Sequence, residues 1–276
     1  MGKIPFDYRK TYGQEAMCEY EKLTNQPLVI ALAEFRFSAI LEMKNYVSAF
    51  QEYLRQDFPY FSTSQTQEMI FEANGLRLNT SEGWIFLSGN KKRAFMLDKD
   101  KLTFMTSEYD RFPKFWDDCL KALAFIETEI KPALLLRVGL RYSDLIIEKD
   151  KKEEIESYVQ TVICKGDFEK IGHQAHRINE TVLETEAGVM AIRSLYGNLN
   201  LSAWHDLSEP PVVITKHPNH SKRILLDFDH FWQPNGDESA PSFNVKFINN
   251  KINSLHKKTR EAFWEITTPE GRERWK

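Results

Sequence analysis

Arginine and carboxylate side chains alternate with apolar residues in three predicted strands. In the run PLVIALAEFRFSAI, which begins at Pro27, alternation puts the aromatic Phe35 and Phe37 on one face of a sheet. Glu34 and Arg36 then point to the other face. The same alternation in the runs 133–147 and 222–232 completes the candidate binding residues, which are Glu34, Arg36, Arg137, Arg141, Asp227 and Asp229.

Two interpretations of these six charged residues remain open. A guanidinium group is a planar fork that suits carboxylate and phosphate, so this face could bind an anion or a charged segment of a partner. Alternatively, the arginines pair with the aspartates and only satisfy a hydrated sheet face, because structural ion pairs gather charges in the same way. The structural interpretation is the simpler one and is favoured, and the six residues are kept as the candidate binding site.

Motifs for catalysis and cofactor binding are missing from the sequence, which holds no Walker A loop, GxGxxG, GxSxG or HExxH. His173/His176 and His217/His220 have HxxH spacing, but a metal site needs three or four ligands on rigid elements. The second pair lies in a predicted turn, His-Pro-Asn-His. A metal, if one binds, would use His217, His220, Asp227 and Asp229. We predict no metal, no cofactor and no enzymatic activity.

The overall composition is that of a folded protein without a generally basic surface. Of 276 residues, 42% are hydrophobic and 28% are charged, which is typical of a folded domain. The formal net charge is −3, so the chain lacks the overall positive charge that would attract nucleic acid or anionic lipid. Three distant cysteines indicate a reducing compartment. Neither a secretory signal nor a run near the ~20 apolar residues of a membrane helix is found. We predict a cytoplasmic protein that does not bind membranes.

Periodicity predicts how the chain divides into helices and strands. Residues 1–26 are a polar lead-in, and helices are predicted over 42–58, 110–130, 149–163 and 242–266. Strand-like runs cover 27–40, 66–73, 76–80, 83–88, 93–97, 101–107, 133–147, 169–186, 188–197, 211–216 and 222–232. Two of the helices carry apolar stripes that should be buried, formed by Phe115, Trp116, Leu120, Leu123, Ile248, Ile252, Leu255 and Phe263.

The order of elements and one local match indicate an internal duplication. FRFSAIL (35–41) aligns without gaps on LRYSDLI (140–146), in the first predicted strand of each half. The predicted fold class is α+β, with tandem duplicated β-α-β(4)-α units, an antiparallel sheet or sheets, and long helices packed on one face. The units are residues 27–132 and 133–276. Their topology is similar to that of the TATA-binding-protein and helix-grip class.

The segment RVGLRYSDLI, which begins at Arg137, and the closing Leu255-His256, Phe263 and Ile266-Thr267 resemble a family of bacterial proteins. That family is sporadically distributed, has no settled activity, and tends to occur in mobile or host-defence gene neighbourhoods. The resemblance spans the chain from the Pro27 strand to the last helix. It implies a bacterial cytoplasmic protein in a defence context and carries over no catalytic residue.

The predicted function is a non-enzymatic binding module that holds a protein or peptide partner, in a bacterial defence or toxin–antitoxin locus. One alternative is a nucleic-acid-binding saddle, which the duplicated topology and the arginines favour and the net charge opposes. The other is a metal-dependent phosphohydrolase or nucleotidyl enzyme. It would place Asp227 and Asp229 on a divalent ion, with Arg36 and Arg141 on phosphate.

Overall fold

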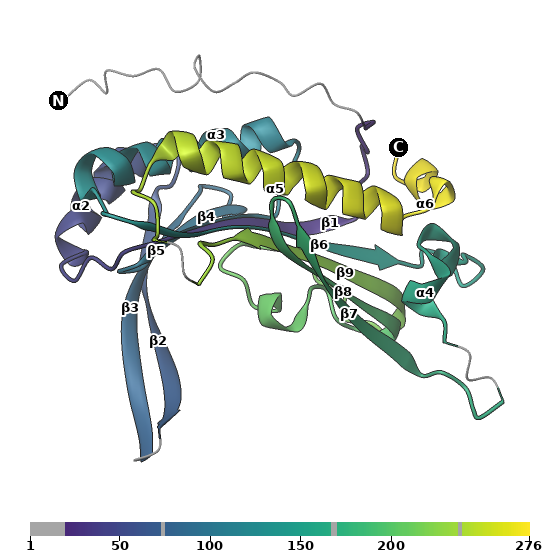
Figure 1. Ribbon diagram of the computed structural model, residues 1–276. Helices are drawn as coiled ribbons and strands as arrows, with labels where there is room; N and C mark the ends of the chain where they lie inside the picture. Colours follow the sequence, from purple (N-terminus) through teal and green to yellow (C-terminus); the bar gives the residue numbers. More distant parts are fainter. Residues whose placement is uncertain (1–19, 73–74, 167–169, 237–238) are drawn as a thin grey trace.

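The computed structural model describes residues 20–72, 75–166, 170–236 and 239–276 (Figure 1). The strands of these segments are β1 (Leu28–Phe37), β2 (Tyr60–Glu72), β3 (Gly75–Leu87), β4 (Arg93–Leu97), β5 (Lys101–Thr106), β6 (Leu135–Ile147), β7 (His176–Thr185), β8 (Gly188–Leu199) and β9 (Ser221–Trp232). They form one antiparallel sheet in the order β2-β3-β4-β5-β1-β6-β9-β8-β7. The predicted lead-in falls largely outside the described residues, which begin at Tyr20.

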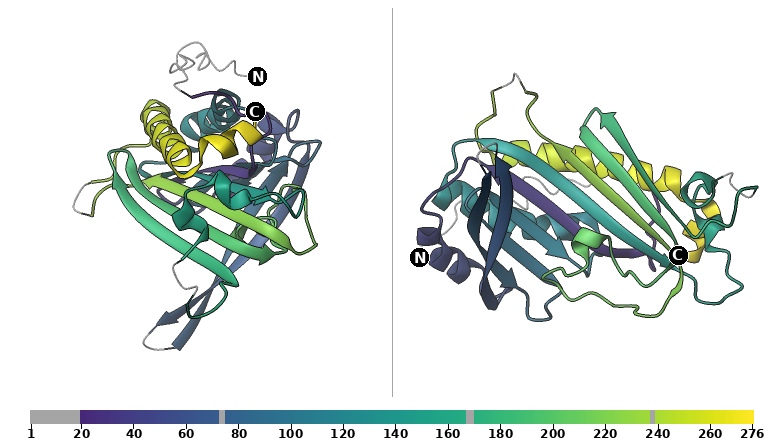
Figure 2. Two further views of the ribbon diagram at one scale, coloured as in Figure 1. Left: turned by 90° about the vertical axis from the view of Figure 1, so that its right-hand side faces the viewer. Right: turned by 90° about the horizontal axis from the view of Figure 1, so that it is seen from below.

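Helical segments in the described part of the chain are mostly short. They are α2 (Lys44–Leu54), α3 (Phe112–Phe125) with the π-helical turn η1 (Ile126–Ile130), η2 (Ile155–Tyr158), α4 (Thr161–Cys164), η3 (His205–Leu207), α5 (Val245–Ile266) and α6 (Pro269–Arg274). α2, α3 and α5 lie on the same side of the sheet (Figures 1 and 2). We call this side the inner face and the opposite side the open face.

The predicted fold class, tandem duplicated β-α-β(4)-α units with long helices packed on one face, is wrong. The structure is a single nine-stranded sheet with mostly short helices in the segments that are described. The helix predicted over 149–163 is replaced by the short turns η2 and α4. The backbone there bonds to the end of α5 and the chain just after it: Gln160 N donates to Ile266 O at 2.7 Å, and Thr268 N donates to Tyr158 O at 3.0 Å. Tertiary pairing has replaced the helical hydrogen bonds.

Residues 200–220, which we call the crossing segment, run between β8 and β9 across part of the open face (Figure 1). The strand predicted over 211–216 does not form within it. The segment instead inserts apolar side chains against the sheet, where Leu207 packs with Ile30 and Trp204 packs with Leu225. Trp204 is only 8% exposed. Burial of these side chains anchors a segment that has little regular structure of its own.

Aromatic side chains fill the inner face of the sheet. Phe35, Phe37, Phe86, Phe95 and Phe104 are fully buried in one cluster that the helices complete. Among the residues predicted to be buried, seven are at most 5% exposed: Phe115, Trp116, Leu120, Leu123, Ile248, Ile252 and Leu255. That prediction is confirmed for these seven, whereas Phe263 is only partly buried.

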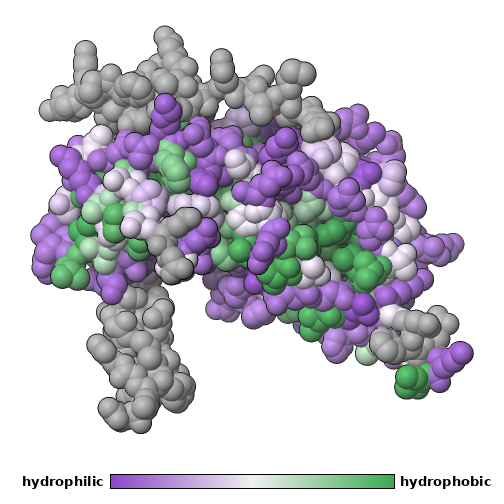
Figure 3. All heavy atoms as spheres, in the orientation of Figure 1, coloured by the Kyte–Doolittle hydropathy of each residue, from purple (hydrophilic) through white to green (hydrophobic). Residues whose placement is uncertain are grey.

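The outer strands differ from the centre in exposure. The hairpin of β2 and β3 extends away from the body of the molecule (Figures 1 and 2). At the opposite edge, β7 pairs with β8 and exposes Ile178, Val182 and Leu183. A hydrophobic patch lies over this β7–β8 edge of the sheet (Figure 3). The centre of the sheet, where β1, β6 and β9 adjoin, is therefore its best packed part.

A carboxyl group is buried in this central region, at Asp144 of β6, which is 4% exposed and lies opposite Leu226 of β9. Burial, with a smaller contribution from the charge of Asp227, raises the pKa of Asp144 to about 8. The folded chain therefore holds a proton at neutral pH that the unfolded chain has released.

Replacing the buried Leu255 by alanine tests the assignment of the inner core. Leu255→Ala should lower the free energy of unfolding by about 2–5 kcal/mol, because it leaves a cavity between α5 and the sheet. The exposed neighbour Lys257 supplies the control, since Lys257→Ala should change stability by less than about 0.5 kcal/mol. Urea unfolding measures both, and a loss below about 1 kcal/mol for Leu255→Ala means that the helix face is assigned wrongly.

Asp144→Asn should change how stability depends on pH. Between the ordinary pKa of 3.8 and the folded value of about 8, the folded state binds more protons than the unfolded state. The free energy of unfolding of the wild type therefore falls as pH rises through this window. From pH 6 to pH 8 the loss should be about 2 kcal/mol, and the variant should lack it. Urea unfolding at both pH values measures the difference, and an identical pH dependence of the two proteins contradicts burial of an isolated carboxyl group.

Candidate functional site

The six predicted site residues all lie on the open face, on β1, β6 and β9. The register places them in neighbouring rows: Arg36 lies opposite Arg137, Arg141 opposite Asp229, and Ser143 opposite Asp227. Arg193 of β8 lies opposite Asp227 on its other side. We call Glu34, Arg36, Arg137, Arg141, Arg193, Asp206, Asp227 and Asp229 the open-face cluster.

Arg141 and Asp227 form the buried half of the open-face cluster. Asp227 is 0% exposed, and its Oδ1 accepts a hydrogen bond from Arg141 Nε at 2.7 Å. Its Oδ2 accepts another from Arg193 Nη1 at 3.1 Å. Both carboxylate oxygens of Asp227 are therefore engaged by guanidinium groups, as a structural ion pair requires.

The crossing segment closes over this ion pair through Asp206. Its two carboxylate oxygens accept hydrogen bonds from Arg141 Nη1 and Nη2 at 2.8 and 2.9 Å, a bidentate arrangement. Those hydrogen bonds lower the pKa of Asp206. Burial favours a lower pKa for Arg141, but its bonds to Asp206 and Asp227 outweigh burial and raise the pKa. Arg141 is a fixed, charged structural residue.

Arg137 is held in a different way from Arg141. Its guanidinium carbon lies 3.8 Å from the ring centroid of Phe231. Its ion pairs are loose, at 3.7 Å from Nε to Glu34 and 3.9 Å from Nη2 to Asp229. Arg137 makes no hydrogen bond to any residue that the structure describes, and its Nε is buried without a partner there. The side chain is oriented by an aromatic ring while its donors stay unused.

Asp229 and Arg36 complete the exposed half of the cluster. Asp229 has only the 3.9 Å contact with Arg137 and a 4.0 Å contact with Arg193 among the described residues. Arg36, with its side chain 48% exposed, donates to Glu34 at 2.7 and 3.3 Å. Charges of both signs therefore lie side by side on an accessible part of the sheet.

Sequence reasoning missed two members of the open-face cluster, Arg193 and Asp206. Alternation in AIRSLYG around the apolar Ile192 could have placed Arg193 on the open face. No sequence signal places Asp206, because a long irregular segment carries it to Arg141.

The histidines named as candidate metal ligands are exposed in the crossing segment, at His217 and His220. His220 Nδ1 lies 3.3 Å from the carbonyl oxygen of Asn198. Over the described ranges no group of three or more His, Cys, Asp or Glu side chains is arranged to hold a metal. Asp227, proposed with them, is engaged by arginines instead.

Comparison of the chain with models of known protein families and with curated proteins finds no match. None of the helices in the described residues is long and apolar enough to cross a membrane.

Two alanine substitutions should separate the buried and exposed halves of the cluster. Arg141→Ala should lower the free energy of unfolding by about 3–5 kcal/mol, because it leaves Asp227 buried without its main partner. Arg36→Ala removes an exposed ion pair and should lower it by less than about 1 kcal/mol. Chemical denaturation measures both, and equal losses would show that the two arginines do not differ in structural role.

Proposed function

We propose that this chain is a binding module whose open sheet face holds a segment of a protein or peptide partner. The observation that carries the proposal is the state of Arg137, which is oriented by Phe231 and makes no hydrogen bond within the described chain. A buried donor without a partner is costly, and a partner carboxylate or carbonyl would remove that cost. Asp229 offers unused acceptors beside it.

The mixed charge of this surface favours a partner with mixed charge. Each exposed arginine has a carboxylate within 4 Å: Arg36 and Arg137 share Glu34, and Arg137 also approaches Asp229. A polyanion would meet repulsion from these carboxylates, whereas a peptide segment with both charges, or with backbone donors and acceptors, would not. This supports a peptide partner over the nucleic-acid alternative.

The enzymatic alternative has less support from the same geometry. It needs the carboxylates of Asp227 and Asp229 to share a divalent ion and Arg141 to bind phosphate. Arg141 instead donates hydrogen bonds to Asp227 and Asp206, and both carboxylate oxygens of Asp227 accept hydrogen bonds from arginines.

Gly139, which is buried beside Arg137, gives a second way to test the face. Gly139 lies between Glu34 and Phe231 in the same row of the sheet. A Cβ atom added there would lie 3.7 Å from Arg137 Nε and 3.8 Å from Phe231 Cβ, which are ordinary contacts. The further atoms of a leucine side chain at this position would have to displace the guanidinium group of Arg137 from the ring of Phe231.

Arg137→Glu and Gly139→Leu should each weaken binding of the partner at least tenfold, one by reversing a charge and one by displacing Arg137 from its position. Arg55→Glu is the matched control, because Arg55 is an exposed residue at the C-terminal cap of α2 with a simple pair to Glu52. A partner is first captured on the immobilised wild-type protein from the cells that encode it, and its affinity is then measured with purified protein. Melting temperatures of the same samples exclude unfolding as the cause.

The binding of the partner should also weaken as salt rises from 0.05 to about 0.5 M, because exposed ion pairs are screened over that range. If the captured partner binds Arg137→Glu, Gly139→Leu and the control alike, the open face is not its binding site. If nucleic acid alone is captured and the variants of the open face no longer bind it, the function is that of the nucleic-acid-binding alternative.

A further inference from the structure

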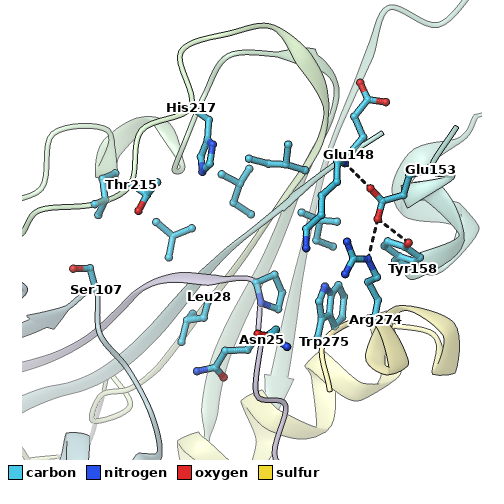
Figure 4. Close-up of a pocket in the computed structure, with 18 of the residues that line it drawn as sticks. Asn25, Leu28, Ser107, Glu148, Glu153, Tyr158, Thr215, His217, Arg274 and Trp275 are labelled. Atoms are coloured by element: carbon cyan, nitrogen blue, oxygen red, sulfur yellow. Dashed lines mark hydrogen bonds and ion pairs between the residues drawn. The ribbon is translucent and has the colours of Figure 1, made fainter. Parts of the chain in front are cut away.

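A pocket of about 530 Å³ opens at the end of the sheet where β1 begins and β6 ends. The residues around it come from the start of β1, the end of β6, the turn between β3 and β4, the η2 region, the crossing segment and the end of α6 (Figure 4). None of the open-face cluster lines it. Its volume is in the range of sites for small organic ligands.

One wall of this pocket is apolar. It is formed by Leu28, Val29, Leu145, Ile147, Val213 and Trp275. Leu145 and Trp275 are nearly buried, at 8% and 6% exposure, whereas Val213 is 54% exposed at the rim. This wall suits the hydrocarbon or aromatic body of a ligand, because its burial removes apolar surface from water on both sides.

Only some of the charged groups at the pocket have ion-pair partners. Arg274 donates to Glu153 at 3.0 Å, and Glu153 also accepts from Tyr158 at 2.9 Å (Figure 4). That pair is neutral and fixed. Lys92 and Lys149 also line the pocket, and neither ammonium group has an ion pair with any described residue.

Glu148 and His217 are the remaining titratable groups at the pocket. Glu148 accepts a hydrogen bond from the backbone N–H of Lys222 at 2.9 Å, so part of its capacity is used. His217 adds an imidazole ring to the rim. Three lysine and arginine side chains face two carboxylates, and the two lysines are the cations left without a partner in the described chain. The net charge of these side chains at the rim is therefore positive.

We propose that this pocket binds a small organic anion with an apolar body, a carboxylate, sulfonate or phosphate ester. The apolar wall takes the body of the ligand, and Lys92 and Lys149 take its anionic head. The two lysines are far apart in sequence, so a ligand that joins them also ties the hairpin between β3 and β4 to the end of β6.

The probe for this site is 8-anilinonaphthalene-1-sulfonate, an aromatic anion whose fluorescence rises in an apolar site. Titration of the full-length protein should give saturable binding. Octanoate and octyl phosphate should displace the probe, whereas octanol and octylammonium should do so at least tenfold less well. Preference of the protein for one head group distinguishes a carboxylate from a phosphate ligand.

Paired variants locate the bound probe. Lys92→Glu with Lys149→Glu should weaken it at least tenfold, and so should Val213→Asp, which places a charge on the exposed part of the apolar wall. Lys99→Glu with Lys151→Glu is the control, since it changes two exposed lysines outside the pocket by the same charge. Arg137→Glu should leave probe binding unchanged, which makes this result independent of the open face.

Three outcomes overturn the proposal. The first is the absence of saturable binding by the folded wild-type protein. The second is equal binding of the probe by the lysine variants and their control, and the third is displacement by octanol as effective as by octanoate. Either of the last two would show an apolar surface that does not select anions.

Discussion

The ion pair between Arg141 and Asp227 joins β6 to β9 in the middle of the sheet, where neither side chain is accessible to water to any large extent. A buried charge is costly unless every donor and acceptor around it is satisfied. Arg193 of β8 and Asp206 of the crossing segment meet that demand from two directions. The pair therefore accounts for two features at once, the cohesion of three adjacent strands and the attachment of an irregular segment to the open face.

The same constraint explains why Arg137 differs from Arg141 although both lie on β6 and on the same face. The crossing segment brings a carboxylate to Arg141, while Arg137 lies next to Phe231 and only near Glu34 and Asp229. One arginine is used to build the sheet, and the other is oriented without being satisfied. An oriented side chain loses little entropy when a ligand arrives, which is how preorganised sites gain affinity.

Alternation of side chains made much of this site predictable from sequence. Once Phe35 and Phe37 must be buried, Glu34 and Arg36 can only lie on the other face, and the same argument places Arg137, Arg141, Asp227 and Asp229. Alternation could not predict which charged side chains form ion pairs with each other. Those pairs depend on the register between strands that are far apart in sequence, and on Asp206, which lies in a loop. The helix predicted over 149–163 failed for a related reason. Its backbone finds partners in Ile266 and Thr268, about a hundred residues away, and local periodicity carries no trace of such contacts.

We propose that Arg137 is the arginine of the open face that binds a ligand, while Arg141 stabilises the fold. The most direct measurement follows the Nε–H resonances of the arginine side chains in ¹⁵N-labelled protein as the captured partner is added. We expect the Arg137 resonance to shift and become protected from exchange with water, while the Arg141 resonance is protected from the start and does not move. A spectrum in which Arg137 stays unchanged in the saturated complex, or in which Arg141 is the one that shifts, would contradict it.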